Sequence, residues 1–222
     1  MKAFFFDMDG ILFNSMPKHA AAWVRVMQEH GFDFTEEICY LNEGRTGTDV
    51  ITEYFLEYEN REPSEDEVWD IYDEKARLFR EMGPTEPIEG IVEVLRFLKK
   101  NRKQIWVVTG SAQASLLDNL NTKIGPFFDR ERMITAYDVT HGKPNPEPYL
   151  KAWDRCKEPK IECCVIENAP LGVRAGKAAG LYTIAVNTGP LADAALWDEG
   201  ADKVFQNMAE LLIWLKNEES SR

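Results

Sequence analysis

Short apolar segments that end in polar residues recur along this chain, and they constrain its fold more than any other feature. The first covers residues 2–6 and stops at Asp7, and later runs cover residues 105–108, 132–135, 163–166, 181–186 and 203–205. Continuous runs of this kind are typical of strands buried on both faces of a parallel sheet. Helical patterns lie between them at residues 90–100, 111–121, 147–156 and 171–179. Alternating strands and helices predict an α/β protein with a doubly wound parallel sheet covered on both faces.

A long block near the N-terminus departs from this alternation. Residues 15–82 show helical periodicity without a convincing buried strand, and the amphipathic stretches cover residues 16–30, 46–58 and 64–82. We interpret the block as an α-helical cap domain inserted after the first strand. Residues 1–14 and 83–222 would then form the core domain.

Composition argues against several classes of partner. The 222 residues include 26 Lys and Arg against 38 Asp and Glu, a formal net charge of −12. Diffuse negative charge repels phosphate backbones and anionic lipids, so we expect no nucleic-acid partner and no membrane. Asp7 interrupts the apolar run at the start, and no later run approaches the roughly 20 apolar residues that span a bilayer. We therefore expect a cytoplasmic protein and, since no long heptad pattern occurs, a monomer.

Polar residues that follow separate strands are predicted to meet at one edge of the sheet, because the carboxyl ends of parallel strands lie side by side. These residues are Asp7, Asp9, Thr109, Ser111, Lys143, Glu167 and Asn168. Two nearby carboxylates facing an amide and a further carboxylate form an all-oxygen site suited to Mg²⁺. Lys143 and the donor groups around Thr109 suit a phosphate. The pattern predicts a metal-assisted phosphoryl-transfer site.

Four motifs, in their order along the chain, resemble those of the haloacid dehalogenase (HAD) superfamily. They are residues 6–10 (FDMDG), 107–111 (VVTGS), 142–146 (GKPNP) and 165–170 (VIENAP). The resemblance covers essentially the whole chain and implies a HAD-like, Rossmann-like core. The helical insert is similar in place and size to the cap of the β-phosphoglucomutase-like subgroup. Residues 12–17 and 43–47, with the fourth motif, are more closely similar to bacterial HAD inorganic pyrophosphatases.

The resemblance implies a role for individual residues of the core. Asp7 matches the nucleophile that attacks phosphorus and forms an aspartyl-phosphate. Asp9 matches the general acid and base that protonates the leaving oxygen and later deprotonates water. The phosphate-holding groups correspond to Thr109, Gly110, Ser111 and Lys143.

The resemblance also implies Mg²⁺ as the cofactor, with Asp7, the Asp9 main-chain carbonyl and Asn168 as ligands. Many relatives have aspartate at the Asn168 position, and a neutral amide contributes less to Mg²⁺ affinity than a carboxylate does. In the pyrophosphatases a cap glutamate at the Glu43 position reaches the metal region, so Glu43 is expected to restore a charge when the cap closes. Glu167 is expected to bind the metal or to orient other groups around it.

Three further residues are candidate substrate contacts, namely Asn14, His19 and Arg45. His19 lies on the apolar face of a cap helix, where a structural histidine is the commoner outcome, and it matches a histidine of β-phosphoglucomutase-like caps. A mutase needs a basic cap residue to hold a second phosphate. Asp49 occupies the aligned position here, although the nearby Arg45 can substitute.

These features predict a Mg²⁺-dependent phosphohydrolase that acts on a small phosphorylated substrate, with inorganic pyrophosphate as the best single candidate. A β-phosphoglucomutase and a broad sugar-phosphate phosphatase are the alternative enzymes. A phosphate-binding protein without turnover is the alternative from another class. Asn168 favours that last interpretation, whereas Asp7, Asp9 and Lys143 argue against it.

Overall fold

The structure, a computed structural model, describes residues 1–110 and 116–220, with side chains for all of these except residues 116–119. Within them, six strands form one parallel sheet in the order β3-β2-β1-β4-β5-β6. The strands are β1 (Ala3–Phe6), β2 (Gln104–Val108), β3 (Met133–Ile134), β4 (Cys163–Glu167), β5 (Tyr182–Val186) and β6 (Lys203–Phe205). The strand order changes direction at β1, so the sheet is doubly wound, as the sequence predicts.

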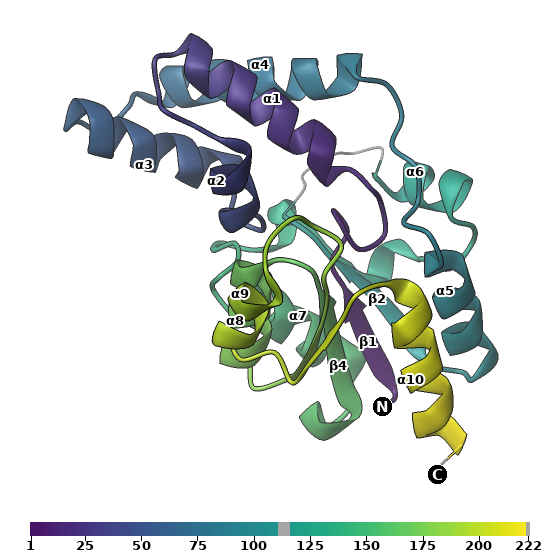
Figure 1. The fold of residues 1–222 in the computed structure, drawn as a ribbon. Helices are drawn as coiled ribbons and strands as arrows, with labels where there is room; N and C mark the ends of the chain where they lie inside the picture. Colours follow the sequence, from purple (N-terminus) through teal and green to yellow (C-terminus); the bar gives the residue numbers. More distant parts are fainter. Residues whose placement is uncertain (111–115, 221–222) are drawn as a thin grey trace.

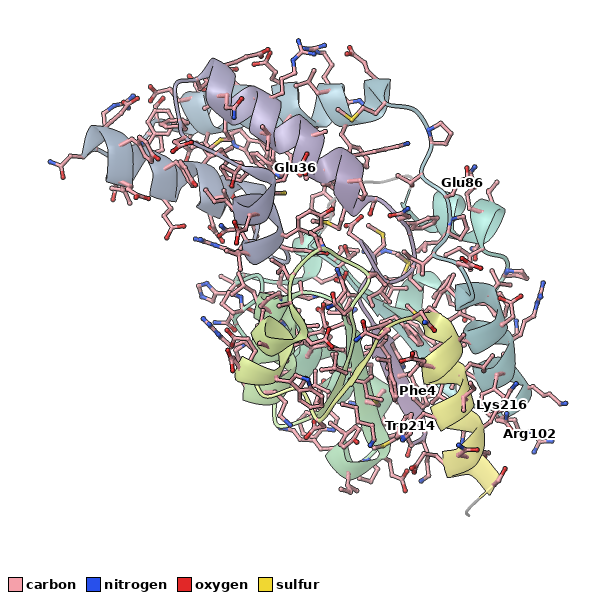
Figure 2. The ribbon with its side chains drawn as sticks, in the orientation of Figure 1. Phe4, Glu36, Glu86, Arg102, Trp214 and Lys216 are labelled. Atoms are coloured by element: carbon pink, nitrogen blue, oxygen red, sulfur yellow. The ribbon has the colours of Figure 1, made fainter. Side chains whose placement is uncertain are left out.

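Helices cover both faces of this sheet (Figure 1). They are α5 (Ile91–Lys100), α6 (Leu116–Lys123), α7 (Glu147–Cys156), α8 (Pro170–Ala178), α9 (Asp193–Asp198) and α10 (Met208–Ser220). Phe4 and Phe6 of β1 share an apolar cluster with α5 and α10, and Trp214 of α10 packs against it (Figure 2). Phe5, between them, lies in a second cluster with α7 and α8. Successive side chains of a strand point to opposite faces, which explains why β1 is apolar throughout.

A group of four helices forms the cap, at the opposite end of the molecule from both termini (Figure 1). They are α1 (Met16–Glu29), α2 (Glu36–Leu41), α3 (Gly47–Glu59) and α4 (Glu65–Glu81). Trp23, Phe34 and Ile71 are among the side chains buried in an apolar core that these helices share. The domain limits at residues 15 and 82 remain a prediction.

The periodicity of the sequence did not predict α2, α9 or α10. Helices α2 and α9 have six residues each, which is too short for a recognisable pattern. Helix α10 places its buried residues Met208, Leu211 and Leu215 at spacings of three and four, but the run of five consecutive apolar residues at 211–215 obscures this pattern in the sequence. None of the helices in the described part of the chain has the length and apolar character needed to cross a membrane.

Leu95 provides a test of the core between α5 and the sheet, where its side chain is fully buried. We expect Leu95→Ala to lower the free energy of unfolding by about 2–5 kcal/mol, because it removes buried carbon atoms and leaves a cavity. Leu56→Ala is the matched control, since that side chain is 47% exposed, and it should cost about 1 kcal/mol or less. Urea denaturation followed by circular dichroism measures both losses. Equal losses would contradict the burial of α5.

Candidate active site

A buried lysine joins two carboxylates at the carboxyl ends of the strands. Lys143 Nζ donates to Asp7 Oδ1 at 2.5 Å and to Glu167 Oε1 at 2.6 Å. It also donates to the Val108 carbonyl oxygen at 3.1 Å. Burial by itself would lower the pKa of Lys143, but the charges of Asp7 and Glu167 raise it above its usual value. The ammonium group therefore stays charged although only 3% of Lys143 is exposed.

For Asp7, in contrast to Lys143, the effect of burial on the pKa outweighs the effect of the oppositely charged neighbour. Burial raises the pKa of Asp7 to about 8, and Lys143 only partly offsets this rise, to which Glu167 and Asp9 contribute. A carboxyl group must lose its proton to act as a nucleophile. More positive charge than Lys143 supplies is therefore needed beside Asp7 to keep it ionised at neutral pH.

Asp9, two residues further on, has partners from the start of the cap. Ser15 Oγ donates to Asp9 Oδ1 at 2.5 Å, and His19 Nε2 lies 3.4 Å from the same oxygen. Lys75 Nζ in turn lies 2.7 Å from His19 Nδ1. Burial alone would raise the pKa of Asp9, but His19, Ser15 and Lys75 together bring it below its usual value. The site thus contains one aspartate biased toward the protonated form, Asp7, and one biased toward the ionised form.

The loop between α2 and α3 closes over this site. Asn168 Nδ2 donates to Glu43 Oε1 at 2.7 Å, which links the core to the cap. Burial raises the pKa of Glu43 well above its usual value, although the hydrogen bond from Asn168 opposes the rise. At Gly44 the backbone has φ +96°, and a Cβ there would lie 3.3 Å from Lys143 Cδ. Glycine therefore suits this position both in conformation and in size.

The oxygen atoms around Asn168 fit a hard divalent cation. Among the described residues, Asn168 Oδ1 has no hydrogen-bond partner although it is buried. Such an atom costs free energy unless a cation or water satisfies it. Together with Asp7 and Glu43 it provides the oxygen ligands that Mg²⁺ prefers. Among the described residues, no group of three or more His, Cys, Asp or Glu side chains is placed to hold a metal ion. A metal here would therefore also need an amide, a main-chain carbonyl and water as ligands.

The hydrogen bonds of Glu167 differ from those of the other proposed metal ligands. Its Oε1 accepts from Lys143 and from the Tyr149 hydroxyl, and its Oε2 accepts from the Asn168 main-chain N–H at 3.1 Å. Both oxygens are therefore occupied by donors of the protein. This geometry suits a group that orients Lys143 and leaves the expected direct contact with a metal without support.

A cavity of about 440 Å³ between cap and core contains most of the expected substrate contacts. Its lining includes Asp7, Asp9, Thr109, Gly110, Glu43, His19 and Arg45. The Arg45 guanidinium donates to Asn42 Oδ1 at 3.0 Å and pairs with Glu53. Ser111 lies outside the described residues.

The structure does not bring Asn14 to this cavity, contrary to expectation. Its side chain is exposed and lines a separate hollow beside Pro87 and Thr188. The reason is local, since the main-chain N–H of Asn14 donates to the Glu86 carbonyl oxygen in the segment that returns from the cap. Asn14 therefore lines a different hollow from Asp9 although it is close in sequence.

Two buried residues next to the catalytic candidates were missed by the sequence analysis. Lys75 lines the cavity and is 7% exposed, and its signal was a lysine on the apolar face of α4, between Ile71 and Leu78. Tyr149 is fully buried on the first turn of α7. No local pattern distinguishes it from an ordinary core tyrosine, because its partner Glu167 lies on β4, in a separate part of the sequence.

The fold and the site together define a class of protein, a doubly wound parallel sheet with a helical cap and a buried aspartate–lysine pair at the carboxyl ends of its strands. Residues 1–180 match the family model of the haloacid dehalogenase-like hydrolases. This chain belongs to that family.

Similar proteins indicate which members of the family this chain resembles. Hexitol phosphatase A of Escherichia coli is 33% identical over 191 residues, which are 84% of this chain and 83% of the relative. A phosphorylated carbohydrates phosphatase of Thermotoga maritima is 31% identical over 188 residues, 83% of this chain and 84% of the relative. A solved structure from Bacteroides vulgatus, described as a candidate β-phosphoglucomutase, matches with a TM-score of 0.95 and 44% identity over 99% of this chain and 89% of that chain. These likenesses confirm the HAD-like fold with a cap of the β-phosphoglucomutase type, and none of these three proteins is named as a pyrophosphatase.

Lys75 should give the stability of the protein a pH dependence. Burial lowers the pKa of Lys75 from 10.5 to about 8. Between these values the unfolded chain binds more protons at Lys75 than the folded protein does. The contribution of this group therefore makes the free energy of unfolding increase as pH rises. We expect wild type to gain stability relative to Lys75→Met between pH about 7.5 and about 9.5 in urea titrations. Lys100→Met, which removes an exposed lysine, is the control, and a pH-independent difference for Lys75→Met would contradict the prediction.

Proposed function

We propose that this chain is a Mg²⁺-dependent phosphohydrolase that works through an aspartyl-phosphate on Asp7. The observation that carries the proposal is the 2.5 Å contact between Lys143 Nζ and Asp7 Oδ1. A fixed ammonium at this point offsets the repulsion between an anionic carboxylate and an anionic phosphoryl group, and burial of both Lys143 and Asp7 strengthens this effect.

The chemistry would proceed in two steps. In the first, an Asp7 carboxylate oxygen bonds to phosphorus while the bond from phosphorus to the leaving oxygen breaks, and Asp9 gives a proton to that oxygen. In the second, Asp9 takes a proton from a water molecule whose oxygen attacks phosphorus and releases the Asp7 carboxylate. Asp9 is ionised when the site is free of substrate, and the negative charge of a bound phosphoryl group favours its protonation.

The remaining groups would hold the substrate and the cofactor. Lys143 and Thr109 would bind the oxygens of the transferred phosphoryl group. Asp7, the Asp9 main-chain carbonyl, Asn168 and Glu43 are the proposed ligands of Mg²⁺. When bound, Mg²⁺ supplies positive charge that neutralises the phosphoryl oxygens and favours the ionised form of Asp7.

Inorganic pyrophosphate is the substrate that we propose first. Arg45, His19 and Lys75 line the cavity from the cap. Basic groups in that position suit a leaving group that is itself a phosphate. Glu43 reaches Asn168 beside the site, and we propose that it takes up space that a sugar ring would need.

A sugar-phosphate phosphatase or β-phosphoglucomutase is the second candidate. The cavity of about 440 Å³ has aromatic side chains on its cap side, including Trp23, Phe34 and Tyr72, which suit the apolar face of a sugar ring. The relatives from Thermotoga maritima and Escherichia coli are named as phosphatases of carbohydrates and hexitols.

We further propose a cytoplasmic monomer, supported by the net charge of −12 and the lack of a heptad pattern.

Phosphate release in the presence of Mg²⁺ tests the substrate. We expect pyrophosphate to have the highest kcat/KM in a panel that includes β-glucose 1-phosphate, other sugar phosphates and nucleotides. Conversion of β-glucose 1-phosphate to the 6-phosphate with little phosphate release would support the mutase instead.

Asp7→Asn should lower kcat for every substrate by at least about a thousandfold, because a neutral amide cannot form the aspartyl-phosphate. Wild-type turnover by this variant would contradict the mechanism.

Glu43 has two proposed roles, as a ligand of Mg²⁺ and as a side chain that limits the space for the substrate. Glu43→Ala should raise the Mg²⁺ concentration for half-maximal pyrophosphate hydrolysis by about tenfold or more, because the site loses a carboxylate near the cation. Glu57→Ala, which removes an exposed glutamate from the neighbouring helix α3, is the matched control. Unchanged turnover and Mg²⁺ dependence in Glu43→Ala would contradict this role.

A further inference from the structure

A buried tyrosine contacts both members of the ion pair behind the nucleophile. The Tyr149 hydroxyl donates to Glu167 Oε1 at 2.5 Å. Lys143 Nζ lies 5.0 Å from the centre of the Tyr149 ring. Tyr149 is fully buried, so it does not face solvent or the substrate cavity. Its position behind Lys143 points to a role that acts through other side chains.

Glu167 is held from several directions. Oε1 accepts from both Lys143 and Tyr149, and Oε2 accepts from the Asn168 main-chain N–H. Helix α8 packs against the carboxylate so closely that a Cβ at Gly172 would lie 2.1 Å from Oε1. A buried carboxylate whose donors come from separate elements has one favourable orientation. The Tyr149 hydroxyl is the neutral donor that sets the position of Oε1.

The orientation of Glu167 determines where Lys143 points. An ammonium group has three N–H donors, and those of Lys143 reach Asp7, Glu167 and the Val108 carbonyl oxygen. A displaced Glu167 carboxylate would draw the ammonium away from Asp7. A second donor on Oε1 also weakens the hold of Glu167 on Lys143, so that more of the positive charge is directed at Asp7 and the phosphoryl group.

The tyrosine remains a donor under ordinary conditions. Burial, with the charges of Glu167 and Asp7, raises the pKa of Tyr149 well above its usual value. The hydroxyl proton is therefore retained, and the contact with Glu167 keeps the same polarity throughout the reaction.

We propose that Tyr149 is a positioning residue, which fixes Glu167 Oε1 so that Lys143 is directed at Asp7 and at the transferred phosphoryl group. The proposal rests on the proposed phosphohydrolase function. It predicts that loss of the hydroxyl impairs the transition state more than substrate binding, since Lys143 would still lie in the pocket but with the wrong orientation.

Tyr149→Phe removes only the hydroxyl. We expect kcat for the best substrate of the panel to fall about tenfold, the size expected for a weakened hydrogen bond to a charged group, while KM changes by less than about twofold. Tyr54→Phe is the matched control, because Tyr54 is 7% exposed and packs against Phe32 and Phe34 in the cap core. It should leave kcat unchanged.

A double-mutant cycle with Glu167→Gln separates positioning from general loss of structure. If Tyr149 acts through Glu167, Tyr149→Phe should lower kcat by less than about twofold in the Glu167→Gln background. Thermal unfolding of the variants establishes that each is folded. A purely structural hydroxyl would give the same fold-loss in both backgrounds.

Four outcomes would overturn the proposal in different ways. Wild-type kcat in Tyr149→Phe, or a rise in KM with kcat unchanged, would exclude positioning of Lys143 even if Glu167→Gln does not fold. Equal losses in both backgrounds would exclude the route through Glu167. Absence of phosphate release by the wild type would instead overturn the proposed function, and the role of Tyr149 with it.

Discussion

The ion pairing of a buried lysine with two carboxylates is the interaction on which the rest of the site depends. Asp7 follows β1, Glu167 ends β4, and Lys143 comes from the loop before α7. Each of these charges would be costly to bury alone, and Lys143 matches the two carboxylates in part, through its single charge and its hydrogen bonds to both. The parallel pairing of β1 with β4 makes this match possible, because it brings the ends of two strands separated by more than 150 residues to the same edge of the sheet.

The two aspartates after β1 are controlled by different parts of the molecule. Asp7 is governed by Lys143 and Glu167 in the core, whereas Asp9 receives its hydrogen bonds from Ser15 and His19, at and beyond the entry to the cap. This division explains how neighbouring carboxyl groups acquire opposite protonation tendencies. It also means that Ser15 and His19 contact Asp9 directly, whereas the charged partners of Asp7 come from the core.

Sequence patterns predicted the sheet, its winding and the cap because strand and helix periodicities are local properties. All six predicted strands are present, and the residues after β1, β2 and β4 meet as expected. The same reasoning failed where the pattern was short or misleading. Helix α2 has six residues, Lys75 occupies a position that an apolar residue usually takes, and Asn14 lines another hollow despite its closeness in sequence to Asp9.

The sequence by itself determined which residues stand at the ends of the strands, and hence which chemistry is available, since each motif is set by a few consecutive residues. Only the tertiary structure decided which partners those residues acquire. Glu43 meets Asn168 across 125 positions and Tyr149 meets Glu167 across 18. Such contacts depend on how the cap rests on the core and how α7 packs beside β4, and no local periodicity encodes the distance between two packed elements.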